Sequence, residues 1–154
     1  MNSMNDSGIV AGLASGQTSH THRLRGLAVT GFIAALAAMV ATTLAAVLAQ
    51  AVGVDFEVPD GGETIPLSGF AVVTGFFSLV GIVIAGALLR WSARPAELFV
   101  WTAVSLTAIS FVAPLLSGAT AATTTALLGL HLVPATVMIP KLARSLRTRT
   151  GPSS

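Results

Sequence analysis

One histidine stands where an ionisable side chain is costly, in the middle of a long apolar run. His131 lies in the stretch TTTALLGLHLVPATVMIPKLARSLR, residues 123 to 147, which two prolines interrupt. An ionisable group inside an apolar segment of this length is by default a candidate functional residue. Its imidazole can relay a proton, contact a ligand or hold a neighbouring helix through a hydrogen bond.

The partners available to His131 favour the last of these roles. A proton relay needs a second titrating group, and the interiors of the apolar runs contain no Asp, Glu, Lys or Arg. A metal centre needs three or four ligands. We therefore expect a hydrogen bond to a neighbouring helix, with ligand contact and proton chemistry as the alternatives. The hydroxyls that can serve as polar partners or line a ligand site belong to Thr42, Thr43, Thr74, Ser78, Ser105, Ser110 and Thr124.

Pro134 adds a second polar group near His131. Proline has no N–H, so the carbonyl of Leu130 loses its helical hydrogen bond and needs another donor. The helix can also bend at this point. Among enzyme signatures, the sequence has no GxSxG, no HExxH, no glycine-rich phosphate loop and no pair of buried carboxylates. We expect a protein that is not an enzyme and carries no cofactor.

Two other groups of residues resemble metal sites only in part. His20 and His22 lie in a segment without apolar periodicity, and two histidines make an incomplete ligand set. The segment GVDFEVPDGGETIPLSG, residues 53 to 69, lacks the spacing of a calcium loop. It holds four of the six acidic residues of the chain: Asp55, Glu57, Asp60 and Glu63. We expect no metal at either place.

The composition points to a lipid environment for the elements that position these residues. The 154-residue chain is 53% hydrophobic and 9% charged, with a mean hydropathy of +0.83. A soluble domain carries about 25% charged residues, and a chain this short cannot bury so much apolar surface in a water-facing globule. The pI of about 10.5 could suggest nucleic acid as a partner. The placement of the charges favours membrane orientation instead, so we expect no nucleic acid.

Four apolar runs are long enough to cross a bilayer, which takes about 20 helical residues. They cover residues 27–52, 68–89, 96–116 and 121–142, and they predict an all-α membrane protein, a four-transmembrane-helix antiparallel bundle within residues 23–144. Small side chains in the first run form stripes at four-residue spacing, which let helices approach closely. One stripe is Ala34, Ala38, Thr42 and Ala46, and the next is Ala37, Ala41, Ala45 and Ala49.

The segments outside the runs carry their own signals. Residues 1–22 are rich in Ser, Gly, Asn and Thr, which predicts a disordered tail, and residues 145–154 form a basic tail. Between the first two runs, Val54, Phe56 and Val58 alternate with acidic residues, and PDGG at 59–62 favours a turn. We expect a short extracytoplasmic β-hairpin-like loop over residues 53–67, capping the outer end of the bundle.

Two prolines and a possible cleavage site bear on the ends of the runs. Pro95 suits the first turn of a helix, whereas Pro114 should kink or end the third run. Arg23 and Arg25 followed by an apolar run and Ala49-Gln50-Ala51 also resemble a signal peptide. The run exceeds the usual 7 to 15 residues of such a peptide, so a retained helix is the favoured interpretation and cleavage the alternative.

The basic residues orient the predicted bundle. With four spans, all eight Lys and Arg residues fall on one side, the side of both termini. Basic residues concentrate on the cytoplasmic side of membrane proteins, so we expect a multi-pass protein of the cytoplasmic membrane with both termini in the cytoplasm. Six of the eight are the predicted contacts to anionic lipid headgroups: Arg90, Arg94, Lys141, Arg144, Arg147 and Arg149. The other two are Arg23 and Arg25, which precede the first run.

The segments GVDFEV, from Gly53, and SGATAATTTALLGLHLVPATVMIPKLAR, residues 117–144, resemble a known family. They are similar to small four-helix integral membrane proteins of actinobacteria that are catalogued as a domain of unknown function. The resemblance implies the four-span layout and supplies no activity, cofactor or catalytic residue.

Taken together, these signals predict a non-enzymatic membrane protein. It would serve as an accessory subunit or scaffold of a cell-envelope membrane complex, with a membrane-protein partner or a second copy as the expected contact. The alternative is a small transporter-like or lipid- or small-molecule-binding protein with a cavity near His131. A third hypothesis, an intramembrane enzyme acting on a lipid, needs a second reactive group near His131.

Overall fold

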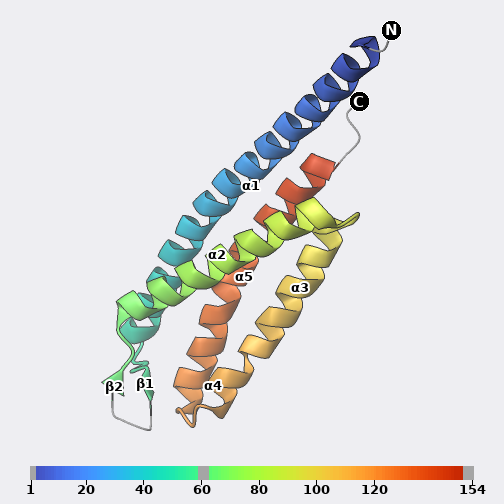
Figure 1. Cartoon of the computed structure of the whole chain (residues 1–154). Helices are drawn as coiled ribbons and strands as arrows, with labels where there is room; N and C mark the ends of the chain where they lie inside the picture. Colours follow the sequence, from blue (N-terminus) through green and yellow to red (C-terminus); the bar gives the residue numbers. More distant parts are fainter. Residues whose placement is uncertain (1–2, 59–62, 151–154) are drawn as a thin grey trace.

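The computed structural model describes residues 3–58 and 63–150, with side chains described for residues 21–57 and 64–149. Its elements follow the order α1 (Ser3–Ala51), β1 (Glu57–Val58), β2 (Glu63–Thr64), α2 (Leu67–Trp91), α3 (Pro95–Ser110), α4 (Val112–Leu116) and α5 (Ala121–Thr150). Figure 1 shows the long helices side by side, with the last turns of α5 beside α1.

The four expected long helices are confirmed by length and composition. The segments Thr21–Ala51, Leu67–Trp91, Pro95–Leu116 and Ala121–Arg149 are each long and apolar enough to cross a membrane. Helix α1 packs most extensively against α2 and α5, and α3 packs against α5 and α2. The bundle therefore follows the order α1, α2, α3, α5 around its axis, with α1 and α3 on opposite sides.

The first small-residue stripe of α1 is the buried face of that helix. Ala34, Ala38, Thr42 and Ala46 are all at most 5% exposed. The second stripe lies at the margin of the contact, since Ala37 is exposed and its other three members are half-buried. Small side chains at this spacing bring the axis of α1 close to its neighbours, which is the source of packing energy predicted from the sequence.

At two glycines, side chains of the facing helix pack directly on the backbone of α1 or α2. A Cβ atom added to Gly31 would lie 2.7 Å from Cγ1 of Ile82, and one added to Gly75 would lie 3.0 Å from Sδ of Met39. Both distances are shorter than an ordinary carbon contact, so each position has room for hydrogen alone unless the neighbouring side chain moves. The α1–α2 pair is thus a tightly closed contact.

Helix α1 ends at a glycine in a left-handed conformation. Gly53 has a φ of 90°, its N–H donates to the carbonyl of Gln50, and the N–H of Val54 donates to the carbonyl of Ala49. These two bonds satisfy carbonyls that the helix end would leave unpaired, and Val54 and Ala49 both pack against the cluster around Phe56. The chain therefore turns sharply out of α1 toward the loop.

The loop after α1 is closed by a buried phenylalanine and a minimal strand pair. Phe56 is fully buried although its φ is 48°, and its ring lies 5.0 Å from the ring of Phe70. Strands β1 and β2 pair antiparallel, with Glu57 opposite Thr64. This ladder has two residue pairs, so the segment is mostly irregular. The turn predicted at residues 59–62, with Asp60, lies outside the described residues.

Pro114 interrupts the third span as the sequence predicts. Helix α3 ends at Ser110 and α4 begins at Val112, two residues before the proline. Proline cannot donate to the carbonyl four residues earlier, which is that of Ser110. The N–H of Phe111 bonds back to the carbonyl of Ala108 in a tighter turn, and the chain continues as the short α4. At the other end, Pro95 occupies the first turn of α3, as expected.

Helices α1 and α5 extend into the two segments that were predicted to be tails. Helix α1 begins at Ser3, whereas residues 1–22 were expected to be disordered. No proline occurs before residue 59, so every residue of α1 has the N–H that a helical hydrogen bond needs. Helix α5 runs to Thr150, past the expected start of a tail at residue 145. Leu142 and Leu146, one turn apart, are fully buried and hold that extension against the bundle.

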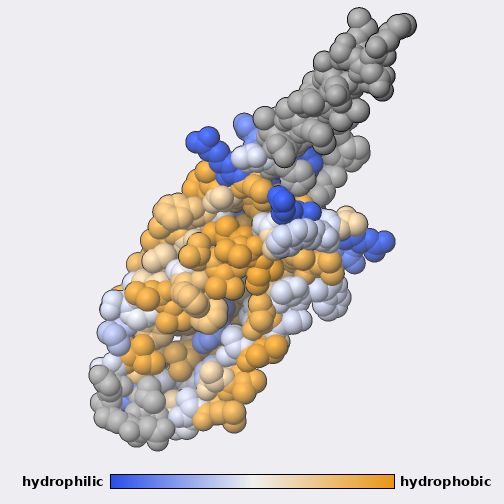
Figure 2. Space-filling view, in the orientation of Figure 1, coloured by the Kyte–Doolittle hydropathy of each residue, from blue (hydrophilic) through white to orange (hydrophobic). Residues whose placement is uncertain are grey.

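The core consists of two apolar clusters at opposite ends of the bundle. The basic-end cluster is centred on Leu27, Ala38, Phe99, Leu142 and Leu146. The loop-end cluster is formed by Ala46, Phe56 and Leu130 with the partly buried residues around them. Outside these clusters the helices expose large apolar side chains, and Figure 2 shows this hydrophobic surface below a hydrophilic end.

Candidate functional site

His131 lies on α5 and bonds to its own helix. Its Nδ1 atom is 2.7 Å from the carbonyl oxygen of Leu127, one turn earlier. A carbonyl only accepts, so Nδ1 donates this hydrogen bond. This bond within α5 differs from the expected bond to a neighbouring helix, because an acceptor stands one turn away on the same helix. The carbonyl that Pro134 frees belongs to Leu130, and His131 does not bond to it.

The ring of Phe111, which lies between α3 and α4, packs against the imidazole of His131. The ring of Phe111 lies 6.3 Å from the ring of His131 at an interplanar angle of 78°, an edge-to-face arrangement. Phe111 occupies the junction of α3 and α4, so the break that Pro114 causes also places this ring. The break could be predicted from Pro114, whereas the contact of Phe111 with His131 could not. His131 is half-buried here, between an aromatic edge and its own helix.

The hydroxyls predicted around His131 are divided among separate contacts. Thr42 on α1 and Ser78 on α2 are at least 96% buried, and among the described residues their hydroxyl oxygens have no hydrogen-bond partner. Thr74 is buried one turn from Ser78. Thr124 bonds to the carbonyl of Ala119 at 3.4 Å, near the start of α5. None of these hydroxyls has a hydrogen bond to His131 in the described part of the chain.

The other expected hydroxyl partners serve the helices that carry them. Thr43 bonds to the carbonyl of Met39 at 2.8 Å, and Ser110 bonds to that of Thr107 at 2.7 Å. Such bonds within one helix satisfy a hydroxyl without joining two elements. Ser105 is exposed. The predicted polar residues therefore do not converge on one point.

Five of the six predicted headgroup residues are exposed at one end of the bundle. Arg90 ends α2, Arg94 precedes α3, and Lys141, Arg144 and Arg147 lie along the last turns of α5. The sixth, Arg149, is used within the protein: its Nε donates to Oγ of Ser145 at 3.0 Å, and its guanidinium lies directly over Gly26 of α1. The glycine at position 26 leaves room for this guanidinium, since a side chain there would displace Arg149. That signal was not recognised from the sequence alone.

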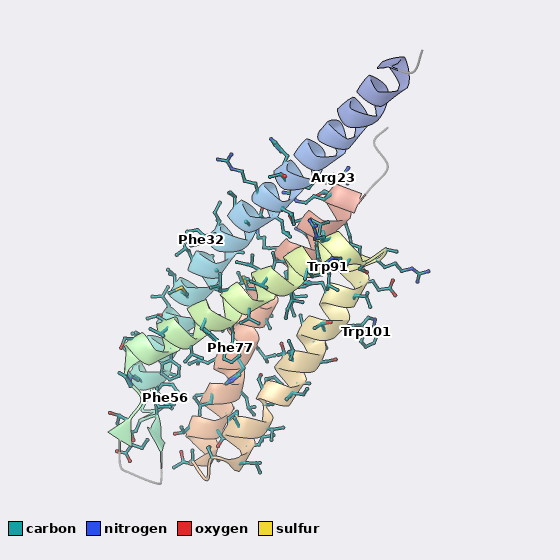
Figure 3. The ribbon with its side chains drawn as sticks, in the orientation of Figure 1. Arg23, Phe32, Phe56, Phe77, Trp91 and Trp101 are labelled. Carbon is teal, nitrogen blue, oxygen red and sulfur yellow. The ribbon has the colours of Figure 1, made fainter. Side chains whose placement is uncertain are left out.

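The remaining groups show how the two ends differ. Trp91 and Trp101 lie near the basic end, whereas Phe56 lies beside the strands at the other (Figure 3). At that other end, Asp55 and Glu57 are exposed. In the part of the chain with described positions, no three His, Asp or Glu side chains group closely enough to hold a metal ion. His22 is exposed, and the side chains of His20 and Glu63 lie outside the described ones.

Two recesses open on the seam between α3 and α5. The first, of about 460 Å³, lies at the basic end and is lined by Arg94, Glu97, Trp101 and Arg147 among others. The second, of about 520 Å³, lies farther along the seam between Val104 and Phe111 of α3 and Leu132 and Pro140 of α5. His131 lines neither of them, so they do not form the cavity expected around it.

The comparison with protein families gives one match. Residues 22–148 match the family described as "Family of unknown function (DUF6069)". This range includes all four long apolar helices apart from a few terminal residues. No curated protein and no solved structure matches the chain.

Proposed function

Because the chain belongs to the DUF6069 family of unknown function, its role has to be argued from its own residues, and we propose a non-enzymatic multi-pass protein of the cytoplasmic membrane. Both termini lie in the cytoplasm in this proposal. The protein serves as an accessory subunit or scaffold of a membrane complex in the cell envelope. A membrane-protein partner or a second copy of the chain binds to its apolar surface.

The distribution of charge carries this proposal. The eight basic residues lie at the end of the bundle where α1 enters, α2 meets α3 and α5 ends. Asp55 and Glu57 lie at the opposite end, and the surface between the ends is apolar. An apolar band between two polar ends suits a bilayer, and the basic end suits the cytoplasmic side. At that side, exposed arginines meet anionic lipid headgroups.

The contacts inside the bundle support a binding role over a catalytic one. His131 bonds to its own helix and faces Phe111. The buried hydroxyls of Thr42 and Ser78 stand on other helices, and no titrating group among the described side chains bonds to them. General acid–base or nucleophilic chemistry needs a second reactive group within hydrogen-bond reach. The transporter-like alternative would need a cavity at His131, and both recesses are lined by other residues.

Exposed aromatic residues on two helices offer places to detect a partner. Phe32 on α1 and Phe77 on α2 are 60% and 65% exposed, whereas Phe56 is fully buried. Figure 3 shows the three side chains along the α1–α2 half. Each can be replaced in turn by a photo-crosslinking phenylalanine analogue, and the protein irradiated in native membranes. We expect a protein adduct of one defined mass from Phe32 or Phe77 and none from Phe56.

The same irradiation can contradict the proposal. Recovery of the chain alone in mild detergent, with lipid adducts at both exposed positions and no protein adduct, would remove the subunit hypothesis. A crosslinked dimer of the chain would identify a second copy as the partner.

A further inference from the structure

The two recesses are consecutive parts of one seam. Along α3, Glu97, Val104, Ala108 and Phe111 recur at intervals of three, four or seven residues, which places them on one face of a helix. Helices α3 and α5 run antiparallel, with Arg147 beside the start of α3 and Leu132 beside its end. On α5, Leu132, Thr136, Pro140 and Arg147 also share a face. The recess and the groove therefore open toward the same side.

The length of the seam equals the depth of one lipid leaflet. Glu97 and Phe111 are fourteen residues apart, which corresponds to about 21 Å along a helix. A bilayer is about 40–45 Å thick with its headgroups, so one leaflet measures roughly 20–22 Å. A molecule that fills the seam from the recess to Phe111 would thus extend from the headgroup level to the middle of the membrane.

The basic-end recess has the chemistry of a phosphate site. Arg94 and Arg147 both line it, and a guanidinium matches the oxygens of a phosphate with paired donors. Glu97 lies 3.7 Å from Arg94, between Nη1 and Oε2, so the lining holds two basic side chains and one acidic side chain. Trp101, which is 67% exposed, adds a ring that favours the level of lipid headgroups.

The groove below the recess has an apolar wall. Val104, Ala108, Leu132 and Ile139 contribute hydrocarbon to it. Its two hydroxyls are directed to their own helices: Thr107 bonds to the carbonyl of Ala103 at 2.8 Å, and Thr136 bonds to that of Val133 at 2.9 Å. An occupant of the groove therefore meets methyl and methylene groups, which suits an acyl chain.

We propose that the α3–α5 seam binds one anionic phospholipid from the leaflet on the basic side. Its phosphate lies between Arg94 and Arg147, and one acyl chain follows the groove past Ala108 toward Phe111. The proposal rests on the membrane placement in the proposed function, but it names a defined site in place of general contact with headgroups. With two arginines and one glutamate in its lining, the recess favours an anionic headgroup such as that of phosphatidylglycerol.

Trp101 can report on this lipid directly. The chain has two tryptophans, so Trp91→Phe leaves Trp101 as the sole fluorophore. The protein is reconstituted in vesicles of phosphatidylcholine containing increasing fractions of phosphatidylglycerol with brominated acyl chains, which quench tryptophan on contact. Brominated phosphatidylcholine is the reference. We expect about fivefold preferential quenching by phosphatidylglycerol, the ratio that corresponds to about 1 kcal/mol for one basic residue near anionic lipid.

Matched variants separate the seam from the rest of the basic end. Arg147→Gln should bring the preference close to one, whereas Arg144→Gln, an exposed arginine of the same helix outside the recess, should leave it near fivefold. Glu97→Gln should raise the preference, because it removes the negative charge from the lining. Ala108→Phe should abolish the preference by filling the groove, and Ala37→Phe on the exposed face of α1 should not.

The outcomes distinguish the lipid site from the membrane placement. Equal quenching of Trp101 by the two lipids, unchanged in the variants, would overturn the phospholipid site while leaving a membrane protein. A loss of preference in Arg144→Gln as large as in Arg147→Gln would also overturn it. The overall charge of the basic end, without a defined site, would then explain the preference for phosphatidylglycerol. Absence of quenching by either lipid, with the chain in the aqueous fraction, would overturn the membrane placement itself.

Discussion

The helices of the α1–α2 hairpin pack closely, whereas those of the α3–α5 hairpin leave recesses between them. In the α1–α2 hairpin, a stripe of small residues and two glycines bring the helices into close contact, and Phe56 fills the end. In the α3–α5 hairpin, Pro114 breaks one helix, two prolines lie within the other, and the seam opens into the recess and the groove. The comparison indicates that the helices of the first hairpin are closely packed, whereas the second hairpin leaves open the seam to which we assign the phospholipid.

The largest effect should come from the end of the α1–α2 hairpin. Phe56→Ala removes a fully buried ring and its contact with Phe70, so we expect it to lower the free energy of unfolding by about 3–5 kcal/mol. Phe77→Ala, at a 65% exposed position, should cost much less. Thermal unfolding in mild detergent, followed by the fluorescence of Trp91 and Trp101, gives both values. Equal losses of unfolding free energy in the two variants would show that the loop-end cluster does not stabilise the bundle.

The next effect contrasts one alanine in each hairpin. Ala38 is fully buried between α1 and its neighbours, so Ala38→Leu should overpack the bundle and lower stability by about 1–3 kcal/mol. Ala108 lines the open groove, and Ala108→Leu should change stability by no more than about 0.5 kcal/mol. The same unfolding measurement compares the two, with Ala37→Leu as an exposed control on α1. A greater loss at Ala108 than at Ala38 would reverse the assignment of the hairpins.

A glycine series measures how tightly α1 and α2 fit. Gly31→Ala should cost about 1–2 kcal/mol, because its methyl group would press on Ile82, a β-branched side chain with little freedom. Gly75→Ala should cost less, since the flexible Met39 can move aside. Gly81 has open space around it, so Gly81→Ala should be neutral or stabilising by up to about 1 kcal/mol. Any other order of the three melting temperatures would contradict the described contact.

The smallest effect concerns His131. Its hydrogen bond lies within α5, so His131→Ala should lower stability by about 0.5–1 kcal/mol and leave the lipid preference of Trp101 unchanged. In a double-mutant cycle with Ser78→Ala, the two losses should add to within about 0.5 kcal/mol, as for sites without a shared bond. A coupling energy above about 1 kcal/mol between the two substitutions would instead support the interhelical hydrogen bond predicted from the sequence.

The parts of the fold that follow from local rules could be predicted from the sequence. The four long helices, the buried stripe from Ala34 to Ala46 and the break before Pro114 depend on apolar length, side-chain size and a missing N–H. The extents of α1 and α5 could not, because low apolar periodicity at residues 1–22 does not stop a helix, and the burial of Leu146 is a tertiary contact.

The candidate site was harder to predict from the sequence than the helices, because its contacts join residues of different helices. The imidazole of His131 has an acceptor on its own helix and several hydroxyls on others, and the sequence does not rank them. The recess at Arg94 and Arg147 needs α3 and α5 side by side, which spacing along the chain does not specify. Arg149 was assigned to lipid because its charge is visible in the sequence, whereas its position over Gly26 is not.

The membrane placement of the whole bundle can be measured most directly by cysteine accessibility. The chain contains no cysteine, so single replacements report without background. Thr64→Cys and Ala119→Cys place a thiol at the acidic end, and Ala93→Cys and Thr148→Cys place one at the basic end. With a membrane-impermeant maleimide on intact cells, the first two should be labelled at once and the last two only after permeabilisation. Labelling of Ala93→Cys and Ala119→Cys from the same side would contradict the account.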